Sequence, residues 1–545
     1  MSDFLWWRDG VIYQVYPRSF ADSNGDGIGD LPGLLAHLDY LNGAPDSLGV
    51  DAIWLSPVYP SPMHDFGYDV ADYESIDPSF GTLEDFDRLV AEAHRRGIRI
   101  VMDLVMNHTS DLHPWFVESR SSRTNPKRDW YLWRDGGRAG HHCRPGRMPN
   151  NWQAVFGGKA WEWDPATEQY YYHMFLKQQP DLNWRSPQLR ARMFEMMKFW
   201  LDRGVDGFRL DVVSGYFKDA AFRDNPPALG LRGFDRQKHI HDSDQPELMG
   251  VLDDLRHLLD SYPERMAVGE VGGDAPRLAA RYCGNGADLL HLAFNFDFTG
   301  QPWLPRRLQE SALRWEAALH SNAWPCYTLS NHDLSRHATR FGGGPSSDRR
   351  AKAAAALLLT LRGTPFLYYG EELGLGDTPI PRSEIQDPPG LKYWPIYRGR
   401  DPERTPMPWN AGPQAGFTTG CPWLRLNRDY ARRNVAAQQA DPASVFNFYR
   451  ELLNLRRASP ALRRGRYHPL LHQPVTAMAY LRESAEQTML VAINFFGWPV
   501  QVTVDESLLG RRWRLRLTST PDEGARVQGN SLRLAPFEAC VLEAE

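Results

Sequence analysis

Short strand-like apolar segments alternate with helix-like segments through most of the chain. Eight strand-like segments are found, at residues 11–16, 50–56, 98–105, 205–213, 266–270, 292–296, 325–331 and 364–370. Helical patterns such as residues 83–97 and 189–204 lie between them. Strands that alternate with helices form parallel sheets, so eight such units predict an α/β fold with a closed (β/α)8 TIM barrel.

Two stretches depart from this alternation. Residues 107–178, between the third and fourth predicted strands, are rich in Trp, Pro, Gly, Asn and Arg and lack helical periodicity. Structureless loops of that length are uncommon in compact domains, so we expect an inserted small domain. Residues 465–545 are β-rich with turn residues between the apolar runs, which predicts a C-terminal antiparallel β-sandwich domain. The barrel would then comprise residues 1–106 and 179–464.

Charge and cysteine content narrow the range of partners. Sixty-two Lys and Arg against 67 Asp and Glu give a net charge of −5, which does not favour nucleic acid or an anionic membrane surface as a partner. The longest apolar run, residues 353–361, is too short to span a membrane. The five cysteines are odd in number and widely spaced, and the N-terminus lacks a signal-peptide pattern. We therefore expect a cytoplasmic protein with reduced thiols that acts on a small molecule.

Polar residues follow several of the predicted strands. Catalytic groups of such barrels lie at the carboxyl ends of the strands, and four of these ends carry Asp103, Asn107 and His108, then Arg209 and Asp211, then Glu270, then Asn331, His332 and Asp333. Any one of these residues alone is more typical of a capped or salt-bridged loop. Their recurrence at four strand ends indicates a catalytic site.

Three of these residues are carboxylates that suit cleavage of a glycosidic bond. That reaction needs one carboxylic acid to protonate the leaving oxygen and a second carboxylate to attack or stabilise the developing cation. Asp211, Glu270 and Asp333 provide this set. Arg209 lies on the same side of its strand as Asp211 and would keep that carboxylate ionised and oriented.

The ordered motifs resemble a known family. DLVMNH (103–108), GFRLD (207–211), GE (269–270) and NHD (331–333) are similar to the four conserved regions of glycoside hydrolase family 13, the α-amylase family. QPDLN (179–183), VIYQVYPRSF (11–20), DFGYD (65–69) and RDPERTPMPW (400–409) resemble its α-glucosidases and oligo-1,6-glucosidases. The resemblance runs almost end to end. It implies an exo-acting, retaining α-glucosidase that hydrolyses terminal α-linked glucose in substrates such as maltose, isomaltose, sucrose or trehalose, and that also transfers glucose.

The resemblance also implies residue roles. Asp211 would be the nucleophile, Glu270 the general acid/base and Asp333 the residue that stabilises the transition state. The glucose unit would be bound by Asp65, Tyr68, His108, Arg209, His332 and Arg400. Phe156 and Phe175 resemble the aromatic wall that the inserted domain provides. Packing of that domain on the barrel is the alternative role for the two phenylalanines.

Departures from the family pattern leave the preferred linkage open. Val212, after the nucleophile, resembles enzymes that act on α-1,6 linkages, although broad α-glucosidases also carry it. Glu270 is followed by VGG (271–273), which indicates an open acceptor side and glucose transfer. An oligo-1,6-glucosidase (isomaltase) and a sucrose or trehalose isomerase therefore remain alternatives. A non-enzymatic binding relative is disfavoured because all three carboxylates are present.

The segment DSNGDGIGD, residues 22–30, resembles the first half of a calcium-binding loop. Its ligands would be Asp22, Asn24, Asp26, the Ile28 carbonyl and Asp30. Gly33 stands where a calcium sensor needs a bidentate glutamate, and a strand precedes the loop, so a sensor is excluded. Oxygen ligands favour Ca²⁺ or Mg²⁺, and the family resemblance implies a structural, non-catalytic ion here. The alternative is a metal-free loop in which Asp30 caps the next helix.

Overall fold

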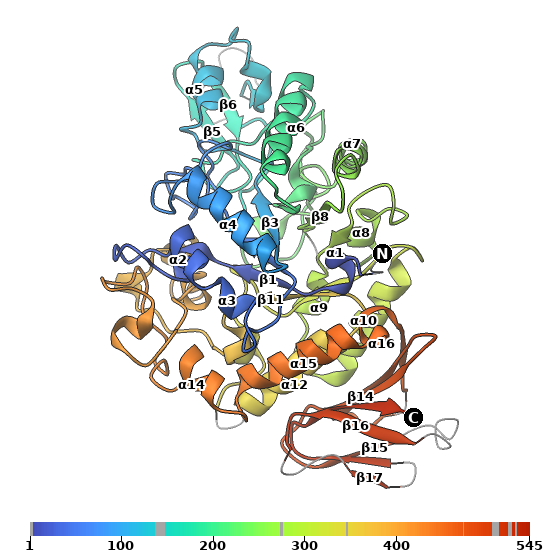
Figure 1. The fold of residues 1–545 in the computed structure, drawn as a ribbon. Helices are drawn as coiled ribbons and strands as arrows, with labels where there is room; N and C mark the ends of the chain where they lie inside the picture. The colour runs from blue at the N-terminus through green and yellow to red at the C-terminus, as the bar shows by residue number, and fades with distance from the viewer. Residues whose placement is uncertain are drawn as a thin grey trace.

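The barrel sheet contains all eight predicted strands (Figure 1). The computed structural model describes residues 4–136, 148–272, 276–344, 347–471, 473–503, 512–521, 526–528 and 531–545. Eight parallel strands pair in the order β10-β11-β1-β2-β3-β7-β8-β9. They are β1 (Ile12–Val15), β2 (Ala52–Leu55), β3 (Arg99–Leu104), β7 (Gly207–Leu210), β8 (Met266–Gly269), β9 (Leu292–Ala293), β10 (Cys326–Thr328) and β11 (Thr364–Tyr368). The Cys326 thiol donates to the Ala293 carbonyl at 3.0 Å and joins the two end strands. The predicted TIM barrel is confirmed.

Helices between the strands cover the outside of the barrel. The main ones are α4 (Leu83–Arg95), α6 (Pro187–Asp202), α7 (Leu248–Asp260), α10 (Pro305–Ala318), α12 (Ser347–Thr360) and α15 (Val445–Ala458). In α4, Thr82 and Asp85 form a capping box, and Phe86, Leu89 and Ala93 are buried along one stripe. The apolar run in α12 is buried along its whole length, as expected for a core helix.

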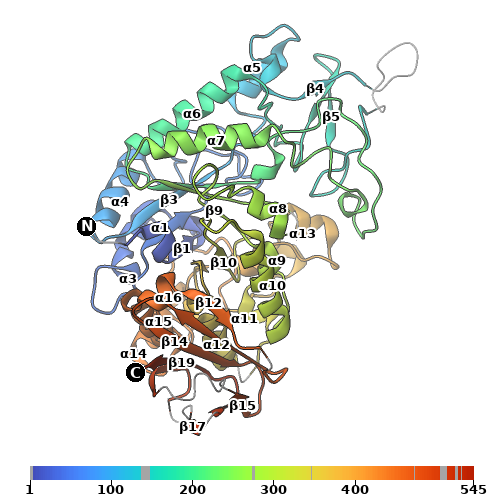
Figure 2. The ribbon, with the colours of Figure 1, turned by 90° about the vertical axis from the view of Figure 1, so that its right-hand side faces the viewer.

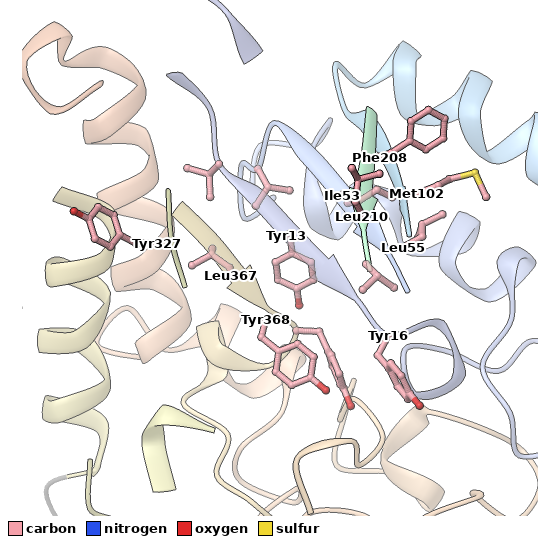
Figure 3. Packing of buried hydrophobic residues seen from close by; sticks show 14 of the residues in the cluster. Tyr13, Tyr16, Ile53, Leu55, Met102, Phe208, Leu210, Tyr327, Leu367 and Tyr368 are labelled. Atoms are coloured by element: carbon pink, nitrogen blue, oxygen red, sulfur yellow. The ribbon is translucent and has the colours of Figure 1, made fainter. Parts of the chain in front are cut away.

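Alternation along the strands decides which side chains face the barrel interior. Ile12, Trp54 and Val101 belong to an apolar cluster built almost entirely from strand residues, which identifies the interior. Their neighbours Tyr13 and Ile53 pack in the larger cluster that joins the strands to the helices (Figure 3). Side chains two residues apart on a strand face the same side. A polar residue that lies two residues after an interior apolar residue therefore points into the mouth of the barrel.

A small sheet is inserted between β3 and β7. Its strands β4 (Trp133–Arg134), β5 (Trp161–Asp164) and β6 (Gln169–Tyr172) pair antiparallel in the order β4-β6-β5, and α5 (Pro114–Ser121) precedes them. Trp152, Trp161 and Tyr172 form part of a separate buried cluster. This part, which includes undescribed residues 137–147, stands apart from the barrel sheet in Figure 1. The expected insertion is present, while its boundaries at 107 and 178 stay predictions.

The C-terminal region forms two antiparallel sheets. One contains β12 (Arg466–Pro469), β13 (Ala477–Glu483), β14 (Thr488–Asn494), β19 (Ala539–Ala544) and β16 (Trp513–Thr518), and the other contains β15 (Val500–Thr503), β18 (Ser531–Leu534) and β17 (Arg526–Gln528). Leu490 and Leu542 of the first sheet share a buried cluster with Val502 and Leu532 of the second. The predicted β-sandwich is confirmed. Within the described residues, no helix is long and apolar enough to cross a membrane.

Candidate active site

A buried guanidinium at the carboxyl ends of β3, β7 and β8 binds three carboxylates. Arg209 Nη1 donates to Asp103 Oδ1 and to Asp211 Oδ1, both at 2.7 Å. Arg209 Nη2 donates to Glu270 Oε2. Because one planar guanidinium bonds both Asp211 and Glu270, these two carboxyl groups lie close together at the mouth of the barrel.

Charge is unbalanced in this cluster. Burial raises the pKa of Asp211 well above its usual range, Arg209 opposes that rise, and the charges of Glu270 and Asp103 reinforce it. Burial also raises the pKa of Asp103 against the same opposing Arg209. Three carboxylates face one guanidinium, so the cluster favours retention of a proton. A site for general acid catalysis needs such a proton.

A second cluster surrounds Asp333. Asp333 Oδ1 accepts from Arg400 Nη1 at 3.1 Å and from Arg404 Nη2 at 2.8 Å, and Oδ2 lies 3.1 Å from His332 Nε2. Burial alone would raise the pKa of Asp333, but His332, Arg400 and Arg404 outweigh burial and hold that pKa well below its usual range. Asp333 is therefore ionised at neutral pH.

Arg400 also closes one side of the site. Its Nη2 donates to Asp65 Oδ1 at 2.7 Å, and Gln179 Nε2 donates to Asp65 Oδ2 at 3.1 Å. Asp387 fixes the same guanidinium, with 3.0 Å from Arg400 Nε and 2.7 Å from Nη2 to Asp387 Oδ1. All three side chains of the Asp65–Arg400–Asp387 group are buried. Asp65 and Arg400 thus form a buried ion pair.

Tyr68 joins the two clusters. Its hydroxyl donates to Asp103 Oδ2 at 2.9 Å, and its ring stacks on His332 with centroids 5.2 Å apart and an interplanar angle of 1°. His332 Nδ1 lies 2.8 Å from Gln14 Nε2, and His332 Nε2 lies 2.6 Å from the Tyr68 hydroxyl oxygen and 3.1 Å from Asp333 Oδ2. These contacts fix the His332 ring between Tyr68 and Asp333.

His108 and the two predicted phenylalanines form a chain of contacts from the Tyr68 backbone to Arg400. His108 Nε2 lies 3.0 Å from the Tyr68 carbonyl, and burial lowers the pKa of His108 to about 4, so the ring is neutral. Phe175 contacts His108 with centroids 5.3 Å apart, and Phe156 contacts Phe175 at 5.4 Å. The Arg400 guanidinium lies 5.0 Å above the Phe156 ring. Both phenylalanines therefore line the site and join the insertion to the barrel.

The backbone after Asp211 is constrained. Val212 has φ 40° and ψ 46°, a left-handed conformation that is uncommon for a β-branched residue. Its N–H donates to Glu270 Oε2 at 3.2 Å. A residue held in this conformation must be stabilised by its surroundings, and the contact to Glu270 is one such stabilising interaction.

Sequence reasoning did not identify several residues that shape the site. Arg404 lies four residues beyond Arg400 in the same motif, which could have identified it. Asp387 carries no local signal, because only the tertiary fold brings it to Arg400. Lys218 follows Asp211 by seven residues and forms a fully buried ion pair with Asp181, and it also donates to Asn107 Oδ1 at 2.9 Å. This pair ties the segment after β7 to the QPDLN motif.

The loop 22–30 turns its side chains toward its own backbone. Asp22 accepts from the amides of Gly25 and Gly27, both at 2.8 Å, and from the Thr418 hydroxyl. Asn24 and Asp26 each accept from the amide two residues further on, at 2.8 Å. These repeated turns keep oxygen atoms exposed on one stretch of chain, which fits a hard cation.

Asp30 fits a cation less well. Its Oδ1 accepts from the Gly33 amide at 2.6 Å and caps α2 (Leu31–Ala36), as expected, while Oδ2 accepts from the Ser23 hydroxyl at 2.8 Å. In the part of the chain that is described, no three or more His, Cys, Asp or Glu side chains are grouped so as to hold a metal. Of the five predicted ligands, Asp22, Asn24, Asp26 and Ile28 fit an ion better than Asp30.

Comparisons with known proteins identify the family of this chain. The family model "Alpha amylase, catalytic domain" matches residues 14–465. A probable alpha-glucosidase of Rhizobium meliloti (strain 1021) is 46% identical over 505 residues, covering 90% of this chain and 89% of its own length. An oligo-1,6-glucosidase of Parageobacillus thermoglucosidasius is 39% identical and covers 98% of both chains. The crystal structure of the alpha-glucosyl transfer enzyme XgtA superposes with a TM-score of 0.92 at 41% identity over 100% of both chains. This chain therefore belongs to the α-amylase family, glycoside hydrolase family 13.

Proposed function

We propose that this enzyme is an exo-acting, retaining α-glucosidase that removes single terminal glucose units from short oligosaccharides and glucosides. The observation that carries the proposal is Arg400, which bonds Asp65 at 2.7 Å and Asp333 at 3.1 Å. A buried bridge at this place closes the pocket behind one glucose ring, so the next sugar can lie only on the acceptor side.

The proposed roles follow from the two clusters. Asp211 attacks C1 of the bound glucose while Glu270 protonates the leaving oxygen, and a covalent glucosyl-Asp211 forms. Water then attacks C1, gives its proton to Glu270, and the bond between C1 and Asp211 breaks. Asp333, held ionised, accepts hydrogen bonds from glucose hydroxyls and favours the developing positive charge. The shared Arg209 supports a short carboxyl separation of roughly 5 Å, which is typical of retaining enzymes.

Two measurements test this proposal. With maltotetraose whose reducing end has been reduced, glucose and the shortened chain should appear in equal amounts from the first minutes, and internal cleavage products should be absent. Proton NMR of the first glucose released from p-nitrophenyl α-glucoside should show the α-anomer. Early maltose release would contradict exo action, and initial β-glucose would contradict retention.

Glucose transfer is the second candidate outcome of the same intermediate. Gly272, two residues after Glu270, is exposed, and a Cβ placed there would meet only Ser214 Oγ at 3.4 Å. Gly273 of the same motif lies outside the described residues. The printed name of the 41% identical structural relative is a glucosyl transfer enzyme. Product analysis on maltose, isomaltose, sucrose and trehalose would distinguish an α-glucosidase from an oligo-1,6-glucosidase and from a sucrose or trehalose isomerase.

We also propose that one Ca²⁺ or Mg²⁺ binds at Asp22, Asn24, Asp26 and Ile28, while Asp30 stabilises the loop through its hydrogen bonds to Ser23 and Gly33. The support is the run of exposed oxygen atoms in that loop. The ion would add stability and take no part in bond cleavage.

We propose a cytoplasmic location because cysteines among the described residues are free: Cys283, Cys326, Cys421 and Cys540.

A further inference from the structure

The short helix α13 (Pro388–Tyr393) packs against the chain that carries Arg400. Asp387, which precedes the helix, makes no capping bond with its side chain and binds Arg400 instead. Asp387 Oδ1 accepts from Arg400 Nε at 3.0 Å and from Nη2 at 2.7 Å, and Oδ2 accepts from the Arg400 amide at 3.0 Å. The helix approaches so closely that a Cβ on Gly390 would lie 2.9 Å from the Gly399 Cα.

The other end of α13 contacts the insertion. Lys392 Nζ donates to the Gly157 carbonyl at 2.6 Å. The Tyr393 hydroxyl lies against the same glycine, because a Cβ on Gly157 would be only 1.7 Å from that oxygen. Gly157 belongs to a tight turn, in which its amide donates to the Ala154 carbonyl at 2.9 Å and its φ is 85°. Figure 2 shows α13 below the inserted strand β5.

Phe156, in the same turn, returns this chain of contacts to Arg400. The Arg400 guanidinium lies 5.0 Å from the centroid of the Phe156 ring. One end of α13 therefore holds the guanidinium directly through Asp387. The other end holds the turn whose aromatic ring lies against the same guanidinium. No other helix described above acts on Arg400 from two sides.

We propose that α13 and the turn 154–158 form a brace that positions Arg400 at the closed end of the glucose pocket. Lys392 and Tyr393 are positioning residues, because they hold the turn and bind neither substrate nor the reacting carboxylates. The proposal rests on the function proposed above, since it takes Arg400 as the group that closes the pocket behind one glucose ring. A long arginine side chain has many rotamers, and contacts on both sides of its guanidinium restrict it to the binding geometry.

The brace should affect glucose binding more than bond cleavage. Asp211 and Glu270 are bonded by Arg209, which α13 does not contact through any printed bond of the brace. Asp333 keeps its contacts with Arg404 and His332 when Arg400 shifts. Loss of the brace should therefore raise KM and leave kcat almost unchanged.

The first test is the double variant Lys392→Met/Tyr393→Leu, assayed with p-nitrophenyl α-glucoside and with glucose as competitive inhibitor. KM and the inhibition constant of glucose should each rise about three- to ten-fold, as expected when a contact that orients a binding group is lost, while kcat stays within about two-fold. Lys159→Met removes an exposed lysine just beyond the turn and is the matched control, with unchanged constants. A fall in kcat without a rise in the glucose constant would overturn the proposal.

Two neighbouring glycines separate the contact with α13 from backbone strain. Gly157→Ala places a Cβ against the Tyr393 hydroxyl, whereas a Cβ on Gly158 would meet only Lys392 Nζ at 3.8 Å. Both glycines have a left-handed φ, at 85° and 95°, so alanine is strained at either position. Only Gly157→Ala should raise the inhibition constant of glucose. Equal constants in the two variants would contradict the brace.

The last arm tests the route through Phe156. Phe156→Leu removes the ring that lies against Arg400, so adding Lys392→Met/Tyr393→Leu to it should raise the inhibition constant of glucose no further. A rise that adds in full would show that Lys392 and Tyr393 act by another route, and would overturn the proposal. Absence of cleavage of p-nitrophenyl α-glucoside by the wild-type enzyme would instead overturn the α-glucosidase proposal itself.

Discussion

Two arginine clusters, which Tyr68 joins, differ in charge balance. On one side, the single guanidinium of Arg209 forms ion pairs with Asp103, Asp211 and Glu270. On the other side, two arginines and His332 converge on Asp333, and Arg400 also binds Asp65 and Asp387. The guanidinium groups of both clusters are buried, while Glu270 and Asp333 are partly exposed, and both clusters use bonds between guanidinium and carboxylate groups. The pKa of Asp211 is nevertheless raised while that of Asp333 is lowered.

The difference shows how one buried pocket serves two chemical tasks. Excess negative charge around Arg209 favours a proton, and a retaining mechanism needs one proton to pass between the acid/base and the substrate in each half-reaction. Asp333 itself is contacted by Arg400, Arg404 and His332, and these groups favour a permanent anion, which suits a residue that only binds and stabilises. The number of cationic groups that contact each carboxylate therefore distinguishes the two sides.

The largest expected effect comes from Asp211→Asn. The amide keeps the size of the side chain and its contact with Arg209 but cannot form the covalent intermediate, so kcat for p-nitrophenyl α-glucoside should fall about 10⁴-fold or more. Asp254→Asn on the exposed face of α7 is the matched control and should leave kcat unchanged. A decrease in kcat of less than 100-fold would show that Asp211 is not the nucleophile.

Arg400→Ala should have the next largest effect because it leaves two buried carboxylates without a guanidinium. We expect a loss of about 3–5 kcal/mol in the free energy of unfolding and a rise in KM for maltose. Chemical denaturation and initial-rate kinetics measure these two quantities. Arg425→Ala, which removes an exposed pair with Glu384, should leave the free energy of unfolding close to the wild-type value. Equal losses in both variants would contradict the structural role of the buried bridge.

The sequence predicted the barrel because the period of apolar residues is a local property. All eight strands lie inside the predicted segments, and the positions of Asp211, Glu270 and Asp333 followed from strand ends and motifs. The partners that set their charge state could not be derived in this way. Asp387 and Arg400 lie on an irregular segment after β11, and Lys218 meets Asp181 only after the insertion folds onto the barrel. Pairings between distant loops have no period in the sequence.

Asn substitutions in the two clusters should change stability in opposite directions. Because the pKa of Asp211 is raised in the folded protein, the protonated carboxyl favours the folded state below the ordinary pKa of an aspartate. This contribution to stability is lost as pH rises through the raised value. The lowered pKa of Asp333 means that its contribution is present above its ordinary pKa and is lost as pH falls through the lowered value. At neutral pH, Asp211→Asn should therefore stabilise the protein by about 1 kcal/mol, and Asp333→Asn should destabilise it by about 1–3 kcal/mol.

Thermal unfolding of both variants at pH 7 and pH 5 measures this contrast. The stabilisation by Asp211→Asn should be smaller at pH 5 than at pH 7, because a raised pKa makes the wild-type carboxyl less destabilising as pH falls. Shifts of the same sign for both variants at pH 7 would show that charge balance does not distinguish the clusters.

The smallest effect is expected in the loop 22–30, where carboxylates pair with backbone amides and with no arginine. Asp22, Asn24 and Asp26 already satisfy the amides of the loop, so an ion would only neutralise the charges of the two aspartates. Removing it with a chelator should lower the unfolding free energy by about 1 kcal/mol or less, and restoring Ca²⁺ should reverse the change. Asp26→Asn keeps an oxygen acceptor for the Ile28 amide but loses the charge, so its unfolding midpoint should not respond to the chelator. A wild-type midpoint that is also unresponsive would show that the hydrogen bonds of the loop stabilise it without an ion, in contrast to the carboxylates of the two clusters, which depend on arginine.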